Sequence, residues 1–575
     1  MRVLGLSFSG HGSSICLVED GRIACALNLE RITRRKFSLV ALRGYVEFIQ
    51  RLTATKYRSE PDEYFDFYDV FPAMLEYVTG FQRIEDAGID LVVKTPDNIR
   101  PIPEFGPYSQ FVEDYDRFLN YFRGVPVHFE MEHHLAHAYQ AFLCSPFEEA
   151  AILVVDGSGE QLARLNGNSI STSFNVGRGH HVQVLQEICF PNSVGGVYSA
   201  FTRHLGFRAN QEGNTMALAA FGTDRFYREI QEDTAFHEGG RYSFHLNSGL
   251  NGLRLTDRLE AFCPMCRRGD EILDTHKDAA WAIQRLSEEV LLHAAWGLYE
   301  RTRLPRLAVA GGVGLNCVAN RKILDQTPFE EIYVMPNAGD RGLAAGCALY
   351  GYHVLLGGRE RHPPEDDYLG RDYSEAEILA ALRSAPGIDY RRSSDIAAEA
   401  AALIERRSII GWFQGRAEFG PRALGHRSIV ADPRTPDSKL RLDRDIKKRE
   451  WFRPYAPSVV IEEAGRFFNL GVASPYMLLA CDTRPEVAGS VAGIVHVDGS
   501  ARVQTVDRHQ EPRYHRLLSE LGRRTGIPMV LNTSFNENGA PVVESPRDAV
   551  DALGSMKLDA LAIGDYLAWR AGSSL

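Results

Sequence analysis

The sequence lacks the features of a secreted or membrane-spanning chain. Its longest run without Asp, Glu, Lys or Arg is residues 342–358, where glycines, tyrosines and a histidine favour a buried helix over a membrane span. The first residues carry one Arg and no long apolar core, so no signal peptide is predicted. We therefore expect a cytoplasmic protein with no membrane partner.

Paired cysteines and an excess of basic charge are also missing. Nine cysteines are scattered over 575 residues, which is typical of reduced thiols rather than of a disulfide framework. Cys263-Pro-Met-Cys266 has no second CxxC to complete a zinc site, and no hydrolase nucleophile elbow is found. The 64 Lys and Arg residues are outnumbered by 75 Asp and Glu, which argues against broad binding to nucleic acid.

What is present is the composition of a soluble globular protein, and a length of 575 residues predicts more than one domain. Hydrophobic residues make up 44% of the chain and charged residues 24%. Residues 357–366 combine Gly, Pro and dense charge and indicate a linker, after which Ser374 and Glu377 form a capping box that begins a new helix. We therefore divide the chain into a domain over 1–356 and a second α/β domain over 367–575.

The first domain repeats one pattern. Residues 3–8 predict a strand, and Asp20-Gly21 predicts the turn of a hairpin behind it. Residues 151–155 predict another strand, followed by a hairpin whose strands 161–165 and 170–174 flank Asn166-Gly167-Asn168. A strand and a hairpin in each half indicate an internal duplication.

Three histidines in residues 133–137 form the first candidate site, which is either a metal site or a structural histidine cluster. His133 and His137 are spaced i,i+4 and share one face of a helix, as metal-binding imidazoles do. A metalloprotease is disfavoured because no Glu stands between them as in HExxH. Asp156, at the end of a predicted strand, and Asp340, which could instead be a helix N-cap, offer oxygen ligands. Two His and two Asp suit iron(II), manganese or zinc.

Glycine-rich turns form the second candidate site. Gly311 and Gly312 lie between a predicted strand and a predicted helix, so their amides could hold phosphate, and Gly157 has a matching place after the earlier strand. Two such turns from duplicated halves describe the actin, sugar-kinase and Hsp70 arrangement. In that arrangement the nucleotide lies between the halves.

A basic stretch in the second domain forms the third candidate site. Residues 439–453 hold seven basic and three acidic side chains, and aromatic residues and prolines follow at once. A solvated helix face and a pocket for a nucleotide or acyl phosphate both fit this stretch. Further polar groups could join such a pocket from other segments: Arg422, Arg502, Asn532 and Ser534.

Aromatic residues are dense between residues 56 and 130. Tyr57, Tyr64, Phe67, Phe71 and Phe81 belong to this set. The pattern fits a local helical core, and it also fits part of a pocket for an apolar substrate.

Six ordered segments resemble one family over nearly the whole chain. They are HHLAHA at 133–138, VDGSGE at 155–160, GGVGLN at 311–316, GPRALGHRS at 420–428, REWFRPYAPS at 449–458 and LNTSFN at 531–536. In these segments the chain resembles the O-carbamoyltransferases of the NodU/CmcH type. The resemblance implies a duplicated actin/Hsp70-like (ASKHA) domain followed by a YrdC-like α/β domain.

The resemblance also implies a reaction in two steps and a role for individual residues. Carbamoyl phosphate and ATP, with Mg²⁺, give carbamoyl adenylate in the second domain, and the first domain passes the carbamoyl group to a hydroxyl. Iron is implied as the metal held by His133, His137, Asp156 and Asp340, and His11 is implied in the transfer. Carbamoyl phosphate is implied to bind Lys447, Arg453, Arg502, Asn532 and Ser534. Nucleotide is implied to bind Gly157, Gly311, Gly312, Asn316 and Arg422.

The chain departs from the family pattern at two positions. Gly12 follows His11 where the family often has Asp, so any orienting carboxylate is supplied elsewhere or missing. Asn214 stands where the family often has Lys, which removes a cation near the expected phosphate path. We expect neither change to abolish activity.

The acceptor and the oligomeric state are not encoded in any pattern we can identify. We expect a small natural-product alcohol, such as a macrolide, polyketide or glycoside, in antibiotic or other secondary metabolism, although acidic residues between 60 and 69 would suit a cationic aminoglycoside. A homodimer is the family expectation. Two other functions remain open: a tRNA threonylcarbamoyl-type transferase, which the acidic chain disfavours, and a non-catalytic nucleotide-binding regulator.

Overall fold

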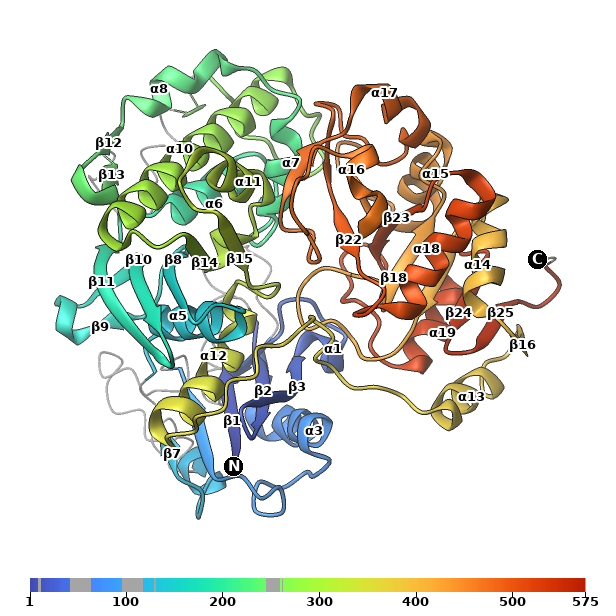
Figure 1. Cartoon of the computed structure of the whole chain (residues 1–575), viewed down its shortest axis with the longest axis horizontal. Helices are drawn as coiled ribbons and strands as arrows, with labels where there is room; N and C mark the ends of the chain where they lie inside the picture. Colours follow the sequence, from blue (N-terminus) through green and yellow to red (C-terminus); the bar gives the residue numbers. More distant parts are fainter. Residues whose placement is uncertain are drawn as a thin grey trace.

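The computed structural model describes residues 1–8, 12–41, 64–95, 117–128, 131–244, 259–260 and 262–573. Within these residues, three sheets have five or more strands, and two-stranded sheets accompany them. Figure 1 shows the first two sheets, with their helices, beside the third, which lies in the orange-to-red part of the chain. The fold is mixed α/β, as the sequence predicts.

The first two sheets have the same strand order and directions. In the first, the order is β3-β2-β1-β6-β7, and in the second it is β11-β10-β8-β14-β15. In each, the central strand pairs antiparallel with one neighbour and parallel with the other. The strands of the first sheet are β1 (Arg2–Ser7), β2 (Ser14–Glu19), β3 (Arg22–Asn28), β6 (Leu91–Lys94) and β7 (Val127–His128). Those of the second are β8 (Glu149–Val155), β10 (Asn168–Arg178), β11 (His181–Cys189), β14 (Arg306–Ala310) and β15 (Glu331–Val334).

This repeat confirms the predicted duplication and the duplicated actin/Hsp70-like arrangement, but the second hairpin is not where the sequence placed it. Asp20 and Gly21 turn with positive φ between β2 and β3, as predicted. In the second half, Asn166-Gly167 turns into β10 from only a short strand, β9 (Gln161–Leu162), while residues 163–165 form a 3₁₀ turn. The hairpin equivalent to β2–β3 is β10–β11, which turns at Gly179. A strong Asn-Gly signal drew the prediction to the wrong turn.

Two helices lie between the duplicated sheets and share one apolar core with them. They are α5 (His133–Cys144) and α12 (Leu343–Tyr350). Their backbones approach closely, because a Cβ on Gly346 would lie 2.1 Å from the carbonyl oxygen of Ala136. This packing confirms that residues 342–358 begin as a buried helix, and it places the start of α5 near the start of α12.

The outer faces of the first two sheets are covered by other helices. On the first sheet, α3 (Phe67–Thr79) packs its aromatic residues against β-strand side chains. On the second sheet, α6 (Val194–His204), α7 (Glu212–Ala219) and α10 (Asp274–Thr302) form the cover, and α11 (Cys317–Gln326) packs beside α10. Two large cores thus flank the central one.

The third sheet has the strand order β16-β25-β24-β17-β18-β23-β19-β22. Its strands are β16 (Ile388–Arg392), β17 (Ile410–Phe413), β18 (Arg427–Ala431), β19 (Ala456–Val460), β22 (Gln504–Val506), β23 (Met529–Ser534), β24 (Ala560–Ile563) and β25 (Tyr566–Arg570). One face carries α13 (Glu375–Arg383) and α19 (Pro546–Ser555), and the other carries α14 (Ile396–Glu405) and α18 (Pro512–Thr525). The capping box at Ser374 and Glu377 forms as predicted. A YrdC-like class for this sheet and a boundary at 357–366 stay predictions.

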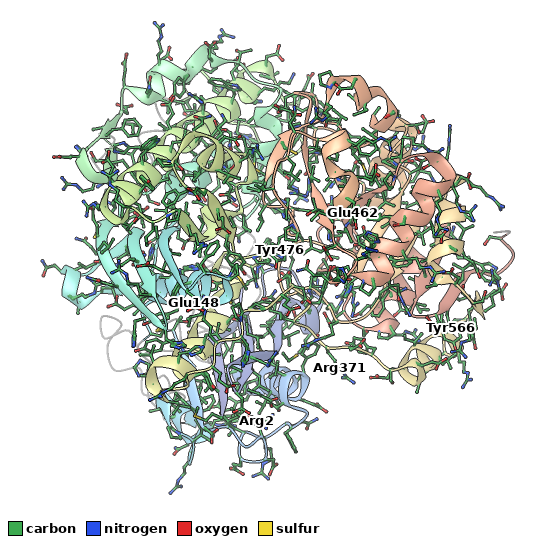
Figure 2. All side chains as sticks on the ribbon, viewed as in Figure 1. Arg2, Glu148, Arg371, Glu462, Tyr476 and Tyr566 are labelled. Atoms are coloured by element: carbon green, nitrogen blue, oxygen red, sulfur yellow. The ribbon has the colours of Figure 1, made fainter. Side chains whose placement is uncertain are left out.

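Contacts join the two parts of the molecule. Tyr476 lies between them in Figure 2, and its ring meets that of Tyr333 edge to face, with centroids 6.4 Å apart. Asn28 donates from Nδ2 to the carbonyl of Phe419 at 2.7 Å. Arg31, in α1 (Glu30–Thr33), donates to the carbonyl of Glu418 at 3.1 Å. The segments before and after the predicted linker are therefore held against each other.

Among the described residues, no helix combines the length and the apolar character needed to cross a lipid bilayer.

Candidate metal centre and anion site

The four predicted metal ligands come together in the folded chain. One ligand atom from each of His133, His137, Asp156 and Asp340 lies within 4.8 Å of the others, and all four residues are buried. The first two stand one turn apart at the start of α5, with ring centroids 4.8 Å apart. Buried imidazole nitrogens facing buried carboxylates form a donor set that suits a divalent transition metal.

The two carboxylates reach this cluster from the second half of the duplication, whereas the two histidines lie on α5, which follows the first sheet. Asp156 follows β8, and its Oδ2 lies 3.2 Å from Nε2 of His133. Asp340 opens the short 3₁₀ turn before α12, and its Oδ1 lies 3.5 Å from Nε2 of His133 and 3.7 Å from Nε2 of His137. Gly339 is the N-cap residue of that turn, so the alternative N-cap role for Asp340 is wrong.

Neighbouring groups fix how the candidate ligands point. Gln140 lies one turn after His137, with Oε1 3.2 Å from the histidine Nδ1, and its Nε2 donates to the carbonyl of Asn337 at 2.6 Å. This contact makes Nδ1 the protonated nitrogen and leaves Nε2 as a lone pair, which has no hydrogen-bond partner among the described residues. Asp156 accepts at Oδ1 from the N–H of Gly312 at 2.9 Å, which leaves Oδ2 for the centre.

Burial and charge shift the pKa values of this cluster. Burial alone would lower the pKa of His133, but Asp340 and Asp156 outweigh it and raise that pKa well above the ordinary value. Burial and Asp340 oppose ionisation of Asp156, yet His133 lowers its pKa to about 2. His134 faces away toward Ser173, and burial lowers its pKa to about 3. A protonated His133 therefore supplies the positive charge that balances Asp156 and Asp340 in this structure.

The predicted nucleotide residues have different surroundings. Gly311 has φ +89°, and a Cβ there would lie 2.1 Å from the carbonyl oxygen of Val155, so only glycine fits this crossing. Gly157 has open space where a Cβ would stand. Asn316 caps α11 through the N–H of Ala319 at 3.1 Å and bonds Gln284, so its side chain holds the turn together.

A group of cations gathers at the third sheet. Arg422 follows β17, and Arg502 ends β21 (Ser500–Arg502), which pairs with β20 (Ala480–Asp482). Both are partly buried, and neither Nε has a partner among the described residues. Burial, and then Arg502, lowers the pKa of Arg422; burial also lowers the pKa of Arg502. The other charged groups acting on these two are arginines and the Cys317 thiol, not carboxylates.

Lys447 and Arg453 lie beside these arginines. The Lys447 ammonium is buried and donates to the carbonyl oxygens of Ser534 and Asn536 at 2.8 and 2.7 Å. Burial, followed by Arg449, lowers the pKa of Lys447 well below its ordinary value. Arg453 has one carboxylate nearby, Glu450, at 3.4 Å. In this structure Lys447 holds the segment at the end of β23. Arg453 has one carboxylate contact, so other N–H groups of its guanidinium can bind a ligand.

Asn532 and Ser534 face the same segment from β23. Asn532 donates from Nδ2 to the carbonyl of Ala423 and to Oγ of Ser458, both at 3.0 Å, while its buried Oδ1 has no partner among the described residues. Ser534 donates from Oγ to Oδ1 of Asn536 at 2.6 Å. The structure therefore brings all five predicted carbamoyl phosphate residues into one region, together with the loop that carries Arg422.

Two cations near this region were missed by the sequence analysis. Lys36 ends the basic run that begins at Arg31, which was the available signal, and Arg341 follows Asp340 directly. Burial lowers the pKa of Lys36 and Glu30 opposes that shift, while Arg341, Arg453 and Arg422 add to it. Both cations come from the duplicated part of the chain, so the anion region receives charge from both parts.

Several predicted residues fall outside the described residues or prove structural. His11 and Tyr57 lie outside them. Phe67 and Phe71 are fully buried and stacked with centroids 4.6 Å apart, in a core that also holds Phe118 and Phe122. These side chains form the local core rather than line a pocket.

Asn214 and the CxxC pair received no firm role from the sequence. Asn214 is buried in α7, and its Nδ2 has no partner among the described residues. The carbonyls of Cys263 and Pro264 contact Nε2 of His204 and of His276, both at 2.9 Å. In the described part of the chain, only the His133 cluster groups three or more ligands suited to a metal, so no zinc site forms at the pair.

Comparison with known proteins gives the family. Models of the carbamoyltransferase N-terminus and C-terminus match residues 118–349 and 401–570, together more than half of the chain. Nodulation protein NolNO of Sinorhizobium fredii is 33% identical, over 97% of this chain and 78% of its own. The 3'-hydroxymethylcephem-O-carbamoyltransferase of Amycolatopsis lactamdurans is 26% identical, over 98% of both chains.

One further sequence relative supports the family, whereas the similarity to a solved structure does not. An uncharacterized protein of Synechocystis is 33% identical over 98% of this chain and 96% of its own. The solved structure of HypF from T. kodakarensis is 12% identical, covers 62% of this chain and 48% of its own, and has a TM-score of 0.34, too low to support any conclusion. On the family models and the sequence relatives, the chain belongs to the carbamoyltransferase family and is a carbamoyltransferase.

Proposed function

We propose that the protein is an ATP-dependent O-carbamoyltransferase that uses carbamoyl phosphate as its donor. Carbamoyl adenylate forms at the cations of the third sheet, in a YrdC-like domain. The carbamoyl group then passes to a hydroxyl beside the His133 cluster, in the actin/Hsp70-like domain. The related cephem enzyme carries O-carbamoyl transfer in its name, which supports a hydroxyl as the acceptor.

The observation that carries the proposal is the unbalanced charge around Arg422 and Arg502. Two partly buried guanidiniums without carboxylate partners in the described chain repel each other, and burial makes that repulsion costly. A bound polyanion relieves it through charge-assisted, bidentate hydrogen bonds. Carbamoyl phosphate and the ATP phosphates, the latter with Mg²⁺, have this charge.

The first step needs these cations because two anions must meet. Water breaks the bond between the carbamoyl group and the phosphate of carbamoyl phosphate, which gives carbamate and inorganic phosphate. An oxygen of the carbamate then forms a bond to the α-phosphorus of ATP, and the bond from that phosphorus to pyrophosphate breaks. Arg422, Arg453 and Arg502 neutralise the phosphates while this occurs. The product is a mixed anhydride, a better carbamoyl donor to a weakly nucleophilic alcohol than carbamoyl phosphate itself. Lys447 holds the Ser534–Asn536 segment in place beside these cations.

The second step is assigned to the His133 cluster. His133, His137, Asp156 and Asp340 would hold a divalent metal, with iron(II) as the family expectation, and the free Nε2 of His137 supports that fit. Such a metal would supply Lewis acidity toward phosphate or carbonyl oxygens. Gly311 and Gly312 shape the turn beside the cluster, and His11 is proposed as the base that takes the hydroxyl proton.

The acceptor is proposed as a small natural-product alcohol, with a macrolide, polyketide or glycoside as the classes to screen. The earlier argument for an apolar acceptor from aromatic density no longer applies, because Phe67 and Phe71 belong to a core. A tRNA acceptor is disfavoured by the net charge of −11.

The deciding experiment is carbamoyl-phosphate-dependent exchange of labelled pyrophosphate into ATP by the purified protein. It requires no acceptor. Exchange that needs carbamoyl phosphate supports adenylation. Adenylation is contradicted if folded protein shows no exchange and also forms no AMP or pyrophosphate when a panel of alcohols is added.

A further inference from the structure

Arg341 connects the two sites through its position in the chain. It follows Asp340 in the 3₁₀ turn over Asp340–Gly342, so its backbone lies at the His133 cluster. Its side chain runs toward the segment after β1, because a Cβ on Gly12 would lie 2.7 Å from Cγ of Arg341. The guanidinium ends 2.9 Å from Oε1 of Glu30 and 5.6 Å from the centre of the Phe37 ring.

The positive charge around Arg341 exceeds the negative charge that faces it. Glu30 faces it through Oε1 and accepts the N–H of Phe37 at Oε2, at 3.0 Å. Burial would raise the pKa of Glu30, but Arg341 and Lys36 outweigh it and lower that pKa, so this one carboxylate serves two cations. Arg341 also adds to the charge acting on Arg422. A guanidinium has five N–H donors, and Glu30 accepts one of them, from Nη1 of Arg341.

The proposed second step creates charge at a place that needs such a group. The acceptor oxygen forms a bond to the carbamoyl carbon, and the bond from that carbon to the adenylate oxygen breaks. Its electron pair leaves on the phosphate of AMP, while the hydroxyl proton goes to the proposed base. The phosphate changes from a monoanion to a dianion, and a fixed guanidinium favours that change.

We propose that Arg341 binds the phosphate of the adenylate and stabilises AMP as the leaving group of carbamoyl transfer. The inference rests on the proposed function and adds a residue to its second step. Arg341 suits this role because it is joined to a candidate metal ligand by one peptide bond and its charge acts on Arg422. Arg422, Arg453 and Arg502 serve the first step.

The test compares the two steps in metal-loaded, full-length protein carrying Arg341→Ala. Adenylation is followed by carbamoyl-phosphate-dependent pyrophosphate exchange, and the second step by release of AMP with water as the acceptor. We expect the ratio of AMP release to exchange to fall about 10- to 100-fold, the value of one or two charge-assisted hydrogen bonds. Arg341→Lys keeps the charge but not the planar, bidentate guanidinium. Its ratio of AMP release to exchange should lie between those of Arg341→Ala and the wild type.

A binding measurement gives a second readout that does not depend on turnover. AMP affinity is measured by calorimetry in an Arg502→Ala background, where the third-sheet site is weakened. Adding Arg341→Ala should reduce the remaining affinity about 10-fold or more. Unchanged affinity overturns the proposal even where AMP release is slow.

Two controls separate this role from a structural one. Glu30→Gln removes the ion pair but keeps the guanidinium, so it should leave the ratio near that of the wild type if Arg341 acts on phosphate. If Arg341 only braces the segment around Phe37, Glu30→Gln and Arg341→Ala should behave alike. Arg444→Ala, which removes an exposed arginine paired with Asp445, should change neither step.

Three outcomes overturn the inference: exchange and AMP release fall together, neither falls, or bound metal is lost with Arg341→Ala. The failure of the proposed function looks different, because the wild type would then show no carbamoyl-phosphate-dependent exchange.

Discussion

The two candidate sites are built on opposite electrostatic principles. At the His133 cluster, imidazoles face carboxylates, and the hydrogen bonds that Gln140 accepts and Gly312 donates already aim the ligand atoms. At the third sheet, cations face one another around Arg422 and Arg502. At the first site, opposite charges attract, so its side chains are organised without a ligand. At the second site, like charges repel, so other contacts must hold the arginines in place.

This difference shows where each site must obtain its precision. Attractive contacts place the metal-competent residues directly. The cationic site depends on a hydrogen-bonded scaffold instead: Oε1 of Glu418 accepts the N–H groups of Leu424, His426 and Arg427. Asp367 accepts the N–H of Gly420 at 2.8 Å. These bonds fix the loop that carries Arg422, so substitutions should affect the two sites in different ways.

The largest expected effect is loss of metal from His137→Ala. Outer partners alone change metal affinity about 10- to 100-fold, so removal of a ligand should lower it by more than 100-fold. Bound metal after dialysis, measured by elemental analysis, reports this. His134→Ala is the matched control, a buried histidine of the same helix that should keep its metal. Retention of metal by His137→Ala would contradict the assigned ligand set.

The next effect sharpens the contrast in charge. Arg502→Ala should slow pyrophosphate exchange about 10- to 100-fold, since charge-assisted bonds to the donor are lost. It should not lower the thermal midpoint of the unliganded protein, because it removes a repulsive charge. Exchange rate and thermal melting are measured together, with Arg466→Ala, an exposed arginine paired with Glu463, as control. A large drop in melting temperature would mean that the arginine is structural.

A smaller effect should follow from loosening the metal ligands without removing one. Gln140→Leu removes the acceptor for Nδ1 of His137 and the bond to Asn337. We expect metal affinity to fall about 10-fold, the lower end for outer partners. Competition with a chelator measures the affinity. An unchanged value would show that packing on α5 alone orients the ring.

The smallest effect concerns pH and the scaffold of the cationic site. Burial first, and Glu418 and Asp366 next, raise the pKa of Asp367 well above 3.8. Because the folded pKa is above the unfolded one, this group adds stability below pH 3.8, and that stability is lost as pH rises through the folded pKa. The slope contributed in that window is up to about 1.4 kcal/mol per pH unit.

Asp367→Asn should remove this part of the pH dependence. Urea unfolding at a series of pH values measures it, with Asp372→Asn at an exposed position as control. Equal slopes in the wild type and Asp367→Asn would show that the carboxyl group is already ionised in the folded protein.

Much of the fold could be predicted locally, and the misses have physical causes. Asp20-Gly21 predicts its hairpin because both residues accept positive φ. The same reasoning failed for the second hairpin, because a strong turn signal at Asn166-Gly167 does not say how far the following strand extends. The aromatic residues around Phe67 left two interpretations open, since density alone does not separate a core from a pocket.

The sequence by itself determined the residue types of each site and the spacing that puts His133 and His137 on one helical face. It also determined the glycines that allow close backbone crossing at Gly311. Only the tertiary structure decided which carboxylates meet the histidines, because Asp156 and Asp340 follow strands of the second sheet, whereas the histidines lie on the helix after the first sheet. It also decided that Arg341 pairs with Glu30 beside the Phe37 ring. These groups are distant in sequence, and long-range packing brings them together.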